Sequence, residues 1–589
     1  MSASLLTAGQ LEYDTLVHAL TVQSRQRPDQ IAYSHLGYPD PRAARGTTTS
    51  LTYGEIDRAA RAFAVTLLQV AQPGDRAVLL LPPGLDYVKA FFGCLYAGII
   101  AVPLYPPSTH NANGRLDAVC VDADPACLVT TDAEMSKVTA WLDTSPIDTT
   151  RLVLSTSEVD ESVYFEPAPQ GGEQIALLQY TSGSTRAPAG VMVPHRGLLA
   201  NAAQVYELLS HVGLSGSDLT FVSWLPLFHD MGLMVGVILP IIKGNGVVQM
   251  SPTAFLRRPE RWLQTISDIP TPTVSAAPNV GYELCADRVD PGQIDGLDLS
   301  RWRFSLAGAE PVRVSTMRKF HAAFAGYGLS ASTLVAGYGL AEATLIVSAN
   351  WRTEAGIETL TVDRDALAQG KVIVTEGEGA QVVSAGAAVP GTRIVIVDPE
   401  TGLPLPDDEL GEVWVSGPAI ATGYFNRPEE TEQTFGGLLC PSDGTRYLRT
   451  GDIGFLHDGE LYPTSRLKDL IIVDGRNFYP PDLEATAEAA HPLVLPGRCS
   501  IFSIDGETGE KIVVLVEARM SVGSPEGAAA AAALRNAVRQ AIFDTHEVGV
   551  HEVLLLGPGG IPRTSSGKIQ RAASRTAYLG GALRVLRPR

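Results

Sequence analysis

The sequence predicts an α/β protein with a large N-terminal domain that includes a small β-rich subdomain, followed by a small α+β domain at the C-terminal end. Three observations predict this organisation. Helical and strand patterns alternate over 51–104, short strands joined by tight turns occupy about 392–423, and the composition changes again after about 467. Alternating helices and strands are typical of parallel sheets covered by helices, so we expect parallel strands early in the chain.

The first elements are predicted from local signals. Thr52 and Glu55 have the spacing of a capping box, and apolar residues then recur on one helical face. A strand is expected at 77–81, where two prolines end it, and it is followed by a helix over 87–97 and a strand over 99–104. This stretch therefore predicts the alternation of an α/β layer.

The later elements are predicted from short apolar runs. Strands are expected at 393–397, 412–415, 470–473 and 511–517. Ser524, followed by a proline, is a start signal for a helix in which Leu534, Val538 and Ile542 share one face. We place the domain boundary near Arg466, because the last ~120 residues have a plausible size for a small domain.

The composition limits the class of protein. The 589 residues are 45% hydrophobic and only 19% charged, with a net charge of −19. Such a chain has enough apolar side chains to bury a sizeable core rather than stay disordered. Its acidic balance argues against a nucleic-acid partner or an anionic membrane surface, which are bound by releasing counterions. We therefore expect an anionic substrate to be held in a dedicated pocket.

The cysteines and the N-terminus predict a reduced, cytoplasmic protein. No Cys-x-x-Cys spacing occurs, so neither a disulfide framework nor a zinc knuckle is indicated. The six cysteines are Cys94, Cys120, Cys127, Cys285, Cys440 and Cys499. The first residues lack the basic start and apolar block of a signal peptide. The longest apolar run, 231–242, is too short to span a bilayer and contains Pro240, so no integral membrane segment is expected.

Several catalytic patterns are present only in part. His546 and His551 are five positions apart with a glycine between them, so they do not share a helical face as zinc ligands must. Gly337 and Gly339 lack the third glycine of a dinucleotide fingerprint, and Lys568 lacks the Ser or Thr that follows the lysine of a Walker loop. No Gly-x-Ser-x-Gly elbow is present. We therefore expect neither a zinc site nor a serine hydrolase.

One loop rich in Gly, Ser and Thr follows the apolar run 175–178. It consists of Thr181, Ser182, Gly183, Ser184, Thr185 and Arg186. Small residues let backbone N–H groups approach an anion, the hydroxyls add donors and the arginine adds positive charge, so this loop is suited to phosphates. An ordinary polar loop has a similar composition, and the loop alone does not decide between the two.

Four further clusters favour a nucleotide site. They contain Gly308 and Ala309, then Tyr338, Gly339 and Glu342, then Asp452 and Arg466, and finally Lys568. The tyrosine offers an aromatic face to a base, and the glutamate offers a carboxylate to Mg²⁺. The aspartate is an acceptor for sugar hydroxyls beside a basic segment. Each cluster alone also fits a turn or a solvated charge, but their joint order along the chain is specific.

In these motifs the chain resembles the adenylate-forming enzymes, which include acyl-CoA synthetases, luciferases and peptide-synthetase adenylation domains. The motifs are 180–191 (YTSGSTRAPAGV), 337–344 (GYGLAEAT), 449–452 (RTGD) and 562–568 (PRTSSGK). Three segments, 178–180, 224–233 and 277–285, look like those of fatty acyl-AMP ligases in particular.

The resemblance covers essentially the whole chain and implies its domain organisation. It implies an N-terminal AMP-binding domain over 1–465, built of stacked α/β subdomains with a β-rich subdomain at about 385–465. A mobile C-terminal lid domain over 466–589 would follow.

The resemblance also implies the roles of the candidate residues. Residues 181–186 would bind the β- and γ-phosphates of ATP, with Glu342 and Thr185 holding Mg²⁺. Tyr338 would stack on adenine, Gly308 and Ala309 would meet its edge, and Gly339 would also bind ATP. Asp452 would bind the ribose hydroxyls, and Arg466 would steady the ribose or a phosphate. Lys568 would bridge the attacking carboxylate and the α-phosphate.

Two further candidates have alternatives. His229 would orient the carboxylate or the α-phosphate, although a satisfied core histidine fits the same apolar segment. Lys468 lies at the hinge position of the family, although a surface lysine in a turn fits as well.

Two features bear on the branch of the superfamily. Many acyl-CoA synthetases have glycine and lysine in the phosphate loop where this chain has Arg186 and Ala189, a variation that fatty acyl-AMP ligases often tolerate. The segment 349–384 resembles an insertion that is characteristic of these ligases and is thought to hinder the rotation required for CoA chemistry. A variable surface excursion is the alternative.

The implied reaction joins a fatty or other lipophilic carboxylic acid to ATP, releasing pyrophosphate and leaving an acyl-adenylate. The acyl group would then pass to a phosphopantetheinyl carrier protein in trans, because no carrier domain follows Arg589. The alternatives are an acyl-CoA synthetase, an enzyme whose adenylate is used by a separate ligase, and a non-catalytic nucleotide-binding protein.

Overall fold

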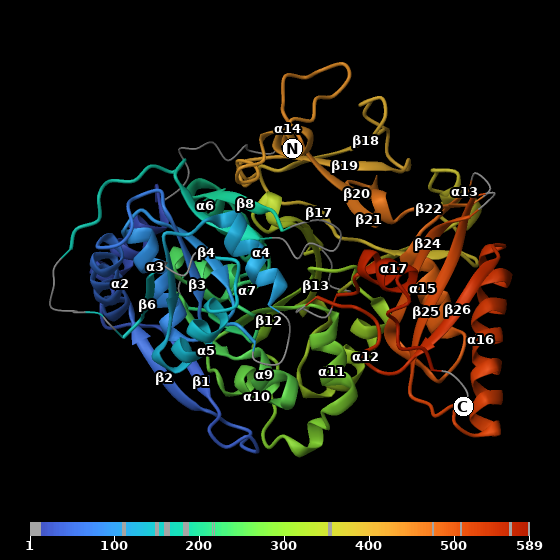
Figure 1. Ribbon diagram of the computed structural model, residues 1–589, viewed down its shortest axis with the longest axis horizontal. Coiled ribbons are helices and arrows are strands. Elements are labelled where there is room, and N and C mark those ends of the chain that lie inside the picture. Colours follow the sequence, from blue (N-terminus) through green and yellow to red (C-terminus); the bar gives the residue numbers. More distant parts are fainter. Residues whose placement is uncertain are drawn as a thin grey trace.

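The computed structural model describes residues 13–108, 113–147, 152–157, 159, 165–180, 188–214, 216, 218–351, 356–473, 476–506, 509–564 and 568–586. In Figure 1 the sheets and helices of the first half lie on one side, strands β18–β21 lie above them, and the C-terminal segment forms the opposite side.

The first sheet has six strands in the order β6-β5-β3-β4-β7-β8. They are β3 (Arg76–Leu80), β4 (Ile100–Leu104), β5 (Cys127–Thr130), β6 (Leu152–Ser155), β7 (Ile175–Tyr180) and β8 (Gly190–Pro194). All paired neighbours are parallel except β7 and β8. One face of β3 packs with α4 (Gly114–Ala123) and α5 (Asp132–Leu142), and the other joins the main core. The predicted parallel α/β layer is confirmed.

The helix predicted after Thr52 is α2 (Tyr53–Leu68). The Thr52 hydroxyl accepts from the Glu55 amide at 3.2 Å, and the Glu55 carboxylate accepts from the Thr52 amide at 2.8 Å, so the capping box is confirmed. α3 (Leu85–Tyr96) packs against α2, and Ile56 and Phe63 are buried with it in the main core.

A second sheet has nine strands in the order β17-β14-β13-β12-β11-β9-β10-β1-β2. They are β1 (Ile31–Gly37), β2 (Thr47–Thr52), β9 (Thr220–Ser223), β10 (Gly246–Met250), β11 (Thr273–Ala277), β12 (Trp302–Ala307), β13 (Leu334–Gly339), β14 (Ile346–Ala349) and β17 (Ala387–Ala388). Along this order, each strand from β13 to β1 runs parallel to its neighbour. The carboxyl ends of β12 and β13 therefore meet at one edge, where open α/β sheets bind ligands.

Further helices cover these sheets. They are α1 (Leu16–Gln26), α6 (His195–His211), α7 (Asp230–Leu233), α8 (Leu239–Lys243), α9 (Pro252–Arg257), α10 (Glu260–Asp268), α11 (Asn279–Arg288) and α12 (Val314–Phe324). The apolar run 231–242 is buried and includes a π-helix, Met234–Ile238. Of the helices in the described parts of the chain, none has both the length and the apolar character needed to cross a membrane.

The predicted β-rich region forms an antiparallel sheet in the order β18-β19-β20-β21. Its strands are β18 (Arg393–Val397), β19 (Gly411–Ser416), β20 (Leu448–His457) and β21 (Glu460–Arg466), with α14 (Pro428–Phe435) between β19 and β20. The predicted strand 393–397 is confirmed at both ends, and the boundary that we place near Arg466 coincides with the end of β21.

The described part of the candidate insertion has its own small hairpin. β15 (Thr359–Val362) pairs with β16 (Ala380–Val383), and α13 (Arg364–Ala368) lies between them in sequence. Val362 and Leu367 are buried against Phe455 of β20 and Tyr479, which lies beyond the proposed boundary. The insertion therefore contacts both the β-rich sheet and the C-terminal segment.

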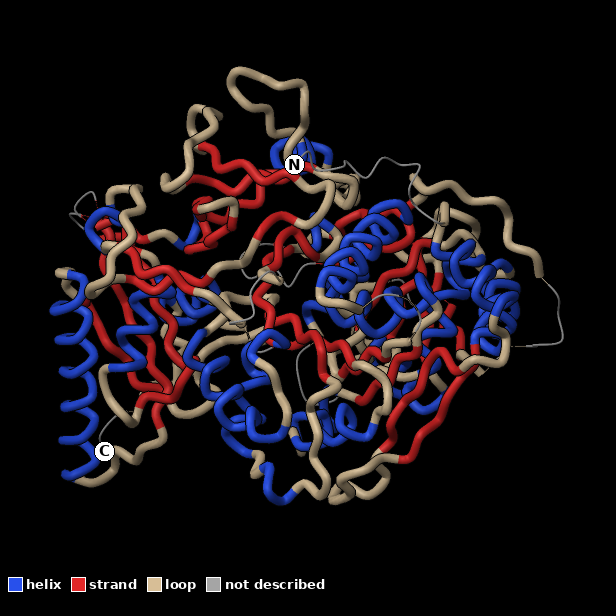
Figure 2. Tube along the Cα trace, turned by 180° about the vertical axis from the view of Figure 1, so that it is seen from behind, coloured by secondary structure: helices blue, strands red, loops and turns tan. Residues whose placement is uncertain are grey.

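The C-terminal segment has a separate core. Its elements are β22 (Ile471–Val473), β23 (Arg476–Phe478), α15 (Pro480–Ala489), β24 (Val494–Gly506), β25 (Gly509–Ala518), α16 (Pro525–His546), β26 (Val550–Leu556) and α17 (Arg571–Leu579). The Ser524 hydroxyl caps α16, and Leu534, Val538 and Ile542 are buried on one face, as predicted. Figure 2 shows α16 along the outer edge of this segment.

Candidate functional site

The ends of β12 and β13 place four candidate residues at one edge of the large sheet. Gly308 and Ala309 follow β12 directly, and Tyr338 and Gly339 end β13. Ala309 has a positive φ of 68°, a strained conformation for a residue with a side chain. A Cβ on Gly339 would lie 1.8 Å from the Leu345 carbonyl oxygen, so only glycine allows this close approach of two chain segments.

Asp452 is the centre of the polar contacts at this edge. The Tyr338 hydroxyl donates to its Oδ2 at 2.7 Å, and the Arg466 Nε lies 3.0 Å from its Oδ1. Asp452 and Arg466 are paired across β20 and β21, so strand register puts them side by side. The Asp452 charge holds the pKa of Arg466 above its usual value, whereas burial and then Asp452 raise the pKa of Tyr338.

Glu342 lies in a 3₁₀ turn, Ala341–Ala343, just after β13. The Tyr424 hydroxyl donates to its Oε1 at 2.8 Å. Burial raises the pKa of Glu342, and the hydrogen bond from Tyr424 opposes the shift. Tyr424 was not predicted from the sequence, because we recognised no motif in the segment that follows β19.

The fit of Glu342 to Mg²⁺ follows from its chemistry. A half-buried carboxylate with one oxygen bonded to a phenol retains acceptor capacity at the other oxygen, and Mg²⁺ prefers such hard oxygen ligands. No group of three His, Cys, Asp or Glu that could hold a metal occurs within the described ranges. A magnesium ion here would therefore complete its shell with phosphate oxygens and water, as is usual for Mg²⁺ bound with a nucleotide.

Lys568 reaches this site from the C-terminal segment. Its backbone bonds to Thr564: the Thr564 amide donates to the Lys568 carbonyl at 2.8 Å, and the Lys568 amide donates to the Thr564 hydroxyl at 3.1 Å. The pKa of Lys568 is lowered to about 8, chiefly by burial and then by the charge of Arg466, against the opposing effect of Asp452 and Glu310. The charge of the lysine therefore interacts with Asp452 of β20, with Arg466 at the end of β21 and with Glu310, which follows β12.

The lowered pKa predicts an alkaline limit to activity. Lys568 keeps its positive charge below about pH 8 and loses it above that value. If this charge assists the reaction, kcat/KM for ATP, which reports the free enzyme, should fall about tenfold per pH unit above this pKa. Between pH 8 and the usual lysine value of 10.5, the unfolded chain binds more protons here than the folded chain, so this group makes stability rise with pH.

The control for this pH profile is the Lys568→Arg variant. Its guanidinium stays charged throughout the range, so whatever activity it retains should lack the alkaline limb. The measurement is kcat/KM of both enzymes from pH 6 to 10. If Lys568→Arg kept the alkaline limb, the limb would belong to a group other than Lys568.

His229 and Asp230 form an ion pair near Lys568. The His229 Nδ1 lies 2.6 Å from the Asp230 Oδ1. Burial lowers the pKa of His229, but the charge and the hydrogen bond of Asp230 together more than offset this, so the net shift is upward; the charges of Lys568 and Arg115 oppose it. Asp230 thus satisfies one ring nitrogen of His229, and the role of His229 at the site stays a prediction. The sequence analysis missed Asp230 as its partner although it is the next residue.

Lys468 lies in the 3₁₀ turn Leu467–Asp469 between β21 and β22. The neighbouring Asp469 accepts from Arg571 at 3.3 Å, and Arg571 also binds Glu484 of α15 at 2.7 Å. The turn is thus connected to the core of the C-terminal segment. A hinge role for Lys468 stays a prediction.

The predicted phosphate loop, 181–186, lies outside the described residues, but the chain on either side of it is linked. The Tyr180 hydroxyl donates to Asp122 at 2.7 Å, and Arg427 donates to Asp122 at 3.0 Å and to the Pro188 carbonyl at 2.8 Å. Asp122 and Arg427 were not predicted, because a lone aspartate in α4 and a lone arginine before α14 carry no local signal.

Comparison with known proteins identifies the family of the chain. Residues 20–425 match the model of the AMP-binding enzyme family. A relative from Mycolicibacterium smegmatis, the long-chain-fatty-acid–AMP ligase FadD32, is 38% identical over 95% of this chain and 94% of its own length. The chain is a fatty acyl-AMP ligase of the AMP-binding enzyme family.

Other comparisons agree with this membership. The medium-chain-fatty-acid–[acyl-carrier-protein] ligase JamA of Moorena producens is 38% identical over 97% of this chain and 96% of its own length. A solved structure from a study of fatty acyl-adenylate ligases from E. coli and L. pneumophila is 32% identical to this chain. Its TM-score is 0.84, and the match covers 97% of this chain and 99% of that one. Residues 468–587 match the AMP domain of the Disco-interacting protein 2-like family.

Membership explains the combination of residues at the site. A fatty acyl-AMP ligase activates a fatty acid as its acyl-adenylate, so it must hold a nucleotide and two reacting anions together. A related structure from L. pneumophila, 34% identical with a TM-score of 0.73 over 99% of both chains, is described in complex with acyl adenylate and pyrophosphate. The alternative of a non-catalytic binding protein is thereby set aside.

Proposed function

We propose that this ligase uses ATP and Mg²⁺ to activate a fatty or other lipophilic carboxylic acid at the site around Asp452, and that it then passes the acyl group to a phosphopantetheinyl carrier protein. The observation that carries the proposal is the electrostatic interaction of Lys568, in the C-terminal segment, with Arg466, Asp452 and the His229–Asp230 pair. This arrangement assembles cations where two anions have to meet.

The chemistry requires such cations. A carboxylate oxygen attacks the α-phosphorus of ATP, the new O–P bond forms as the bond to pyrophosphate breaks, and no proton has to move because the carboxylate is ionised near neutral pH. The main barrier is electrostatic, since both partners are negative and charge develops on the leaving pyrophosphate. Fixed positive groups in a partly buried site lower this barrier.

Lys568 and Arg466 supply that charge. In our proposal Lys568 bridges the attacking carboxylate and the α-phosphate, and Arg466 steadies the ribose or a phosphate. His229, paired with Asp230, orients the acid or the α-phosphate. The raised pKa of His229 favours its charged form, which suits an anionic neighbour.

The remaining roles concern the nucleotide. Tyr338 is proposed to stack on adenine, with Gly308, Ala309 and Gly339 at the edge of the base, and Asp452 to accept from the ribose hydroxyls. The β- and γ-phosphates are assigned to 181–186, and Glu342 with Thr185 to Mg²⁺. When bound, the ion would neutralise charge on the leaving pyrophosphate.

The acceptor is the second half of the proposal. The name of JamA includes an acyl carrier protein, which supports a carrier as the acceptor here. The insertion supports it independently, because Arg364 of α13 pairs with Asp482 of α15 at 3.1 Å and the Tyr479 hydroxyl donates to the Leu367 carbonyl at 3.2 Å. These contacts connect the insertion to the C-terminal segment, which carries Lys568, and they oppose a rotation of that segment. Acyl-CoA synthesis is the alternative.

Breaking this connection should relax the choice of acceptor. In an Arg364→Ala variant we expect unchanged adenylate formation and up to roughly fivefold more acyl-CoA, since a partly exposed ion pair contributes at most about 1 kcal/mol. The matched control is Arg393→Ala, which breaks the Arg393–Asp443 pair within the β-rich region. Equal acyl-CoA yields in both variants would show that the insertion does not limit CoA chemistry.

The experiment that tests the proposed function measures acyl-adenylate from ATP, Mg²⁺ and a panel of fatty acids, followed by a chase with either CoA or a carrier protein bearing phosphopantetheine. We expect adenylate that persists with CoA and is consumed with the carrier. Efficient acyl-CoA formation would instead assign the chain to the synthetase activity, and adenylate that neither acceptor consumes would indicate a separate transfer enzyme.

A further inference from the structure

Glu412 of β19 is a buried carboxylate that no catalytic motif explains. It is only 2% exposed. Its Oε1 accepts from the Gly451 amide at 3.1 Å, and its Oε2 accepts from the Trp414 indole at 2.9 Å and from Arg449 at 2.9 Å. Burial of a charge this deep is unfavourable unless donors and a counter-charge compensate it, and here both are present.

These bonds converge on the turn that carries Asp452. Trp414 pairs with Arg449 and Glu412 with Ile453, so residues 450–452 stand opposite Val413 alone. β20 therefore bulges at this point, and Gly451 adopts a positive φ of 69°. A bulge re-aims the side chains within it, which here include Asp452.

Two further bonds fix the rest of the bulge. The Thr450 hydroxyl donates to the Val413 carbonyl at 2.7 Å and accepts from the Asp452 amide at 3.1 Å. Without the Glu412 carboxylate, the Gly451 amide would lose its partner. The direction of the Asp452 side chain toward Tyr338 and Arg466 thus depends on a residue that touches neither of them.

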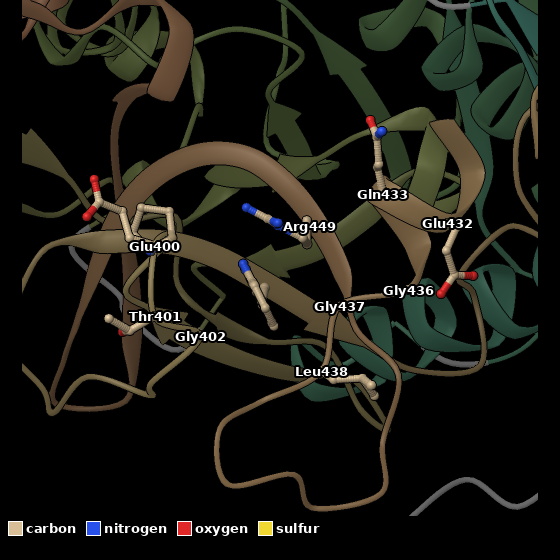
Figure 3. Close-up of a pocket in the computed structure, with 11 residues that line it drawn as sticks. Glu400, Thr401, Gly402, Glu432, Gln433, Gly436, Gly437, Leu438 and Arg449 are labelled. Atoms are coloured by element: carbon tan, nitrogen blue, oxygen red, sulfur yellow. The ribbon is translucent and has the colours of Figure 1, made fainter. Parts of the chain in front are cut away.

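Arg449 connects Glu412 to the outer face of the sheet. Its guanidinium lies over the Trp414 ring at 5.3 Å, and both residues line a surface cavity of about 320 Å³. Figure 3 shows Arg449 in the middle of this cavity, with Glu400 on one side and Glu432 on the other. Glu412 itself is buried and is not among the residues that line the cavity.

We propose that Glu412 is a positioning residue for nucleotide recognition: it holds the Gly451 amide and so aims the Asp452 carboxylate at the ribose hydroxyls of ATP. The inference rests on the proposed role of Asp452. It assigns to Glu412 a contribution to ribose selectivity, which is distinct from a general contribution to folding.

The test compares ATP with 2′-deoxyATP and 3′-deoxyATP in acyl-adenylate formation, using the fatty acid that supports the highest rate. In Glu412→Gln we expect the preference for ATP, as a ratio of kcat/KM values, to fall about tenfold. The amide has a single acceptor oxygen, and when that oxygen meets Trp414 and Arg449 the NH2 group faces the Gly451 amide, so the charge-assisted hydrogen bond to Gly451 is lost. The matched control is Glu432→Gln, which removes an exposed carboxylate paired with Arg446 in the same region, and its ratio should equal that of the unmodified enzyme. Thermal melting confirms that each variant is folded.

Asp452→Ala separates this inference from the proposed site. If Asp452→Ala lowers the preference for ATP and Glu412→Gln does not, the inference is overturned while the site stands. If Asp452→Ala leaves the preference unchanged, the ribose assignment fails and the inference fails with it. Should Glu412→Gln not fold, Glu412→Asp retains the charge for Arg449 but is too short for the Gly451 amide, and an unchanged ratio in that variant equally overturns the proposal.

Discussion

In a Lys568→Ala variant, the rate of acyl-adenylate formation is expected to fall by about 10²–10³, the usual cost of removing one preorganised group that stabilises developing charge. The ammonium of Lys568 lies in a partly buried position that lowers its pKa to about 8, so its charge is poorly screened there and acts strongly on nearby anions. Alanine removes this charge and leaves the contacts of Asp452 with Tyr338 and Arg466 intact.

The loss should therefore appear in kcat and not in nucleotide binding. Pyrophosphate-exchange kinetics measure the first quantity, and calorimetric titration with ATP measures the second, which we expect to change less than about tenfold. Lys511→Ala is the control for removal of a positive charge from the C-terminal segment, because Lys511 lies near the start of β25 in the same segment. Full activity of Lys568→Ala would contradict the proposed role of the lysine.

A Glu342→Gln variant should lose about 10²-fold in adenylate formation at low Mg²⁺, because an amide is a much weaker ligand for Mg²⁺ than a carboxylate. The variant keeps an acceptor for the Tyr424 hydroxyl and nearly the same volume. Raising the Mg²⁺ concentration should restore part of the rate, so the activity must be measured as a Mg²⁺ titration.

Tyr424→Phe is the matched control for Glu342. It removes the hydroxyl that donates to the carboxylate and leaves the charge. We expect a loss of about tenfold and little change in the Mg²⁺ dependence, since a hydrogen bond to a charged group contributes about 1.5 kcal/mol or more. The same Mg²⁺ dependence in Glu342→Gln as in the unmodified enzyme would remove Glu342 from the proposed metal site.

Local signals in the sequence predicted many of the elements. The capping box of α2, the buried face of α16 and the strand β18 were all predicted from residues within a few positions of one another. Such features depend on periodicity and on side chains that satisfy nearby backbone groups, so they are legible without a tertiary structure. The motifs likewise indicated the family, because each consists of adjacent residues.

The partners within the site could not be predicted in this way. Tyr338 and Asp452 are 114 positions apart and are joined by a single hydrogen bond of 2.7 Å. Asp122 and Arg427 are separated by 305 positions, and neither lies in a motif. Such pairs exist only because distant parts of the chain pack together in the fold. A single sequence does not reveal which of many distant polar residues will meet.

The sequence by itself determined the fold class, the order of the main elements and the family, because hydrophobic periodicity, capping and contiguous motifs are local properties of a chain. Only the tertiary structure decided how Asp452 is aimed and why Lys568 has a lowered pKa. The first depends on strand register and a bulge held by Glu412, and the second on burial between parts of the chain that are distant in sequence. Both effects arise from desolvation and hydrogen bonding in packed surroundings, which form when the chain has folded.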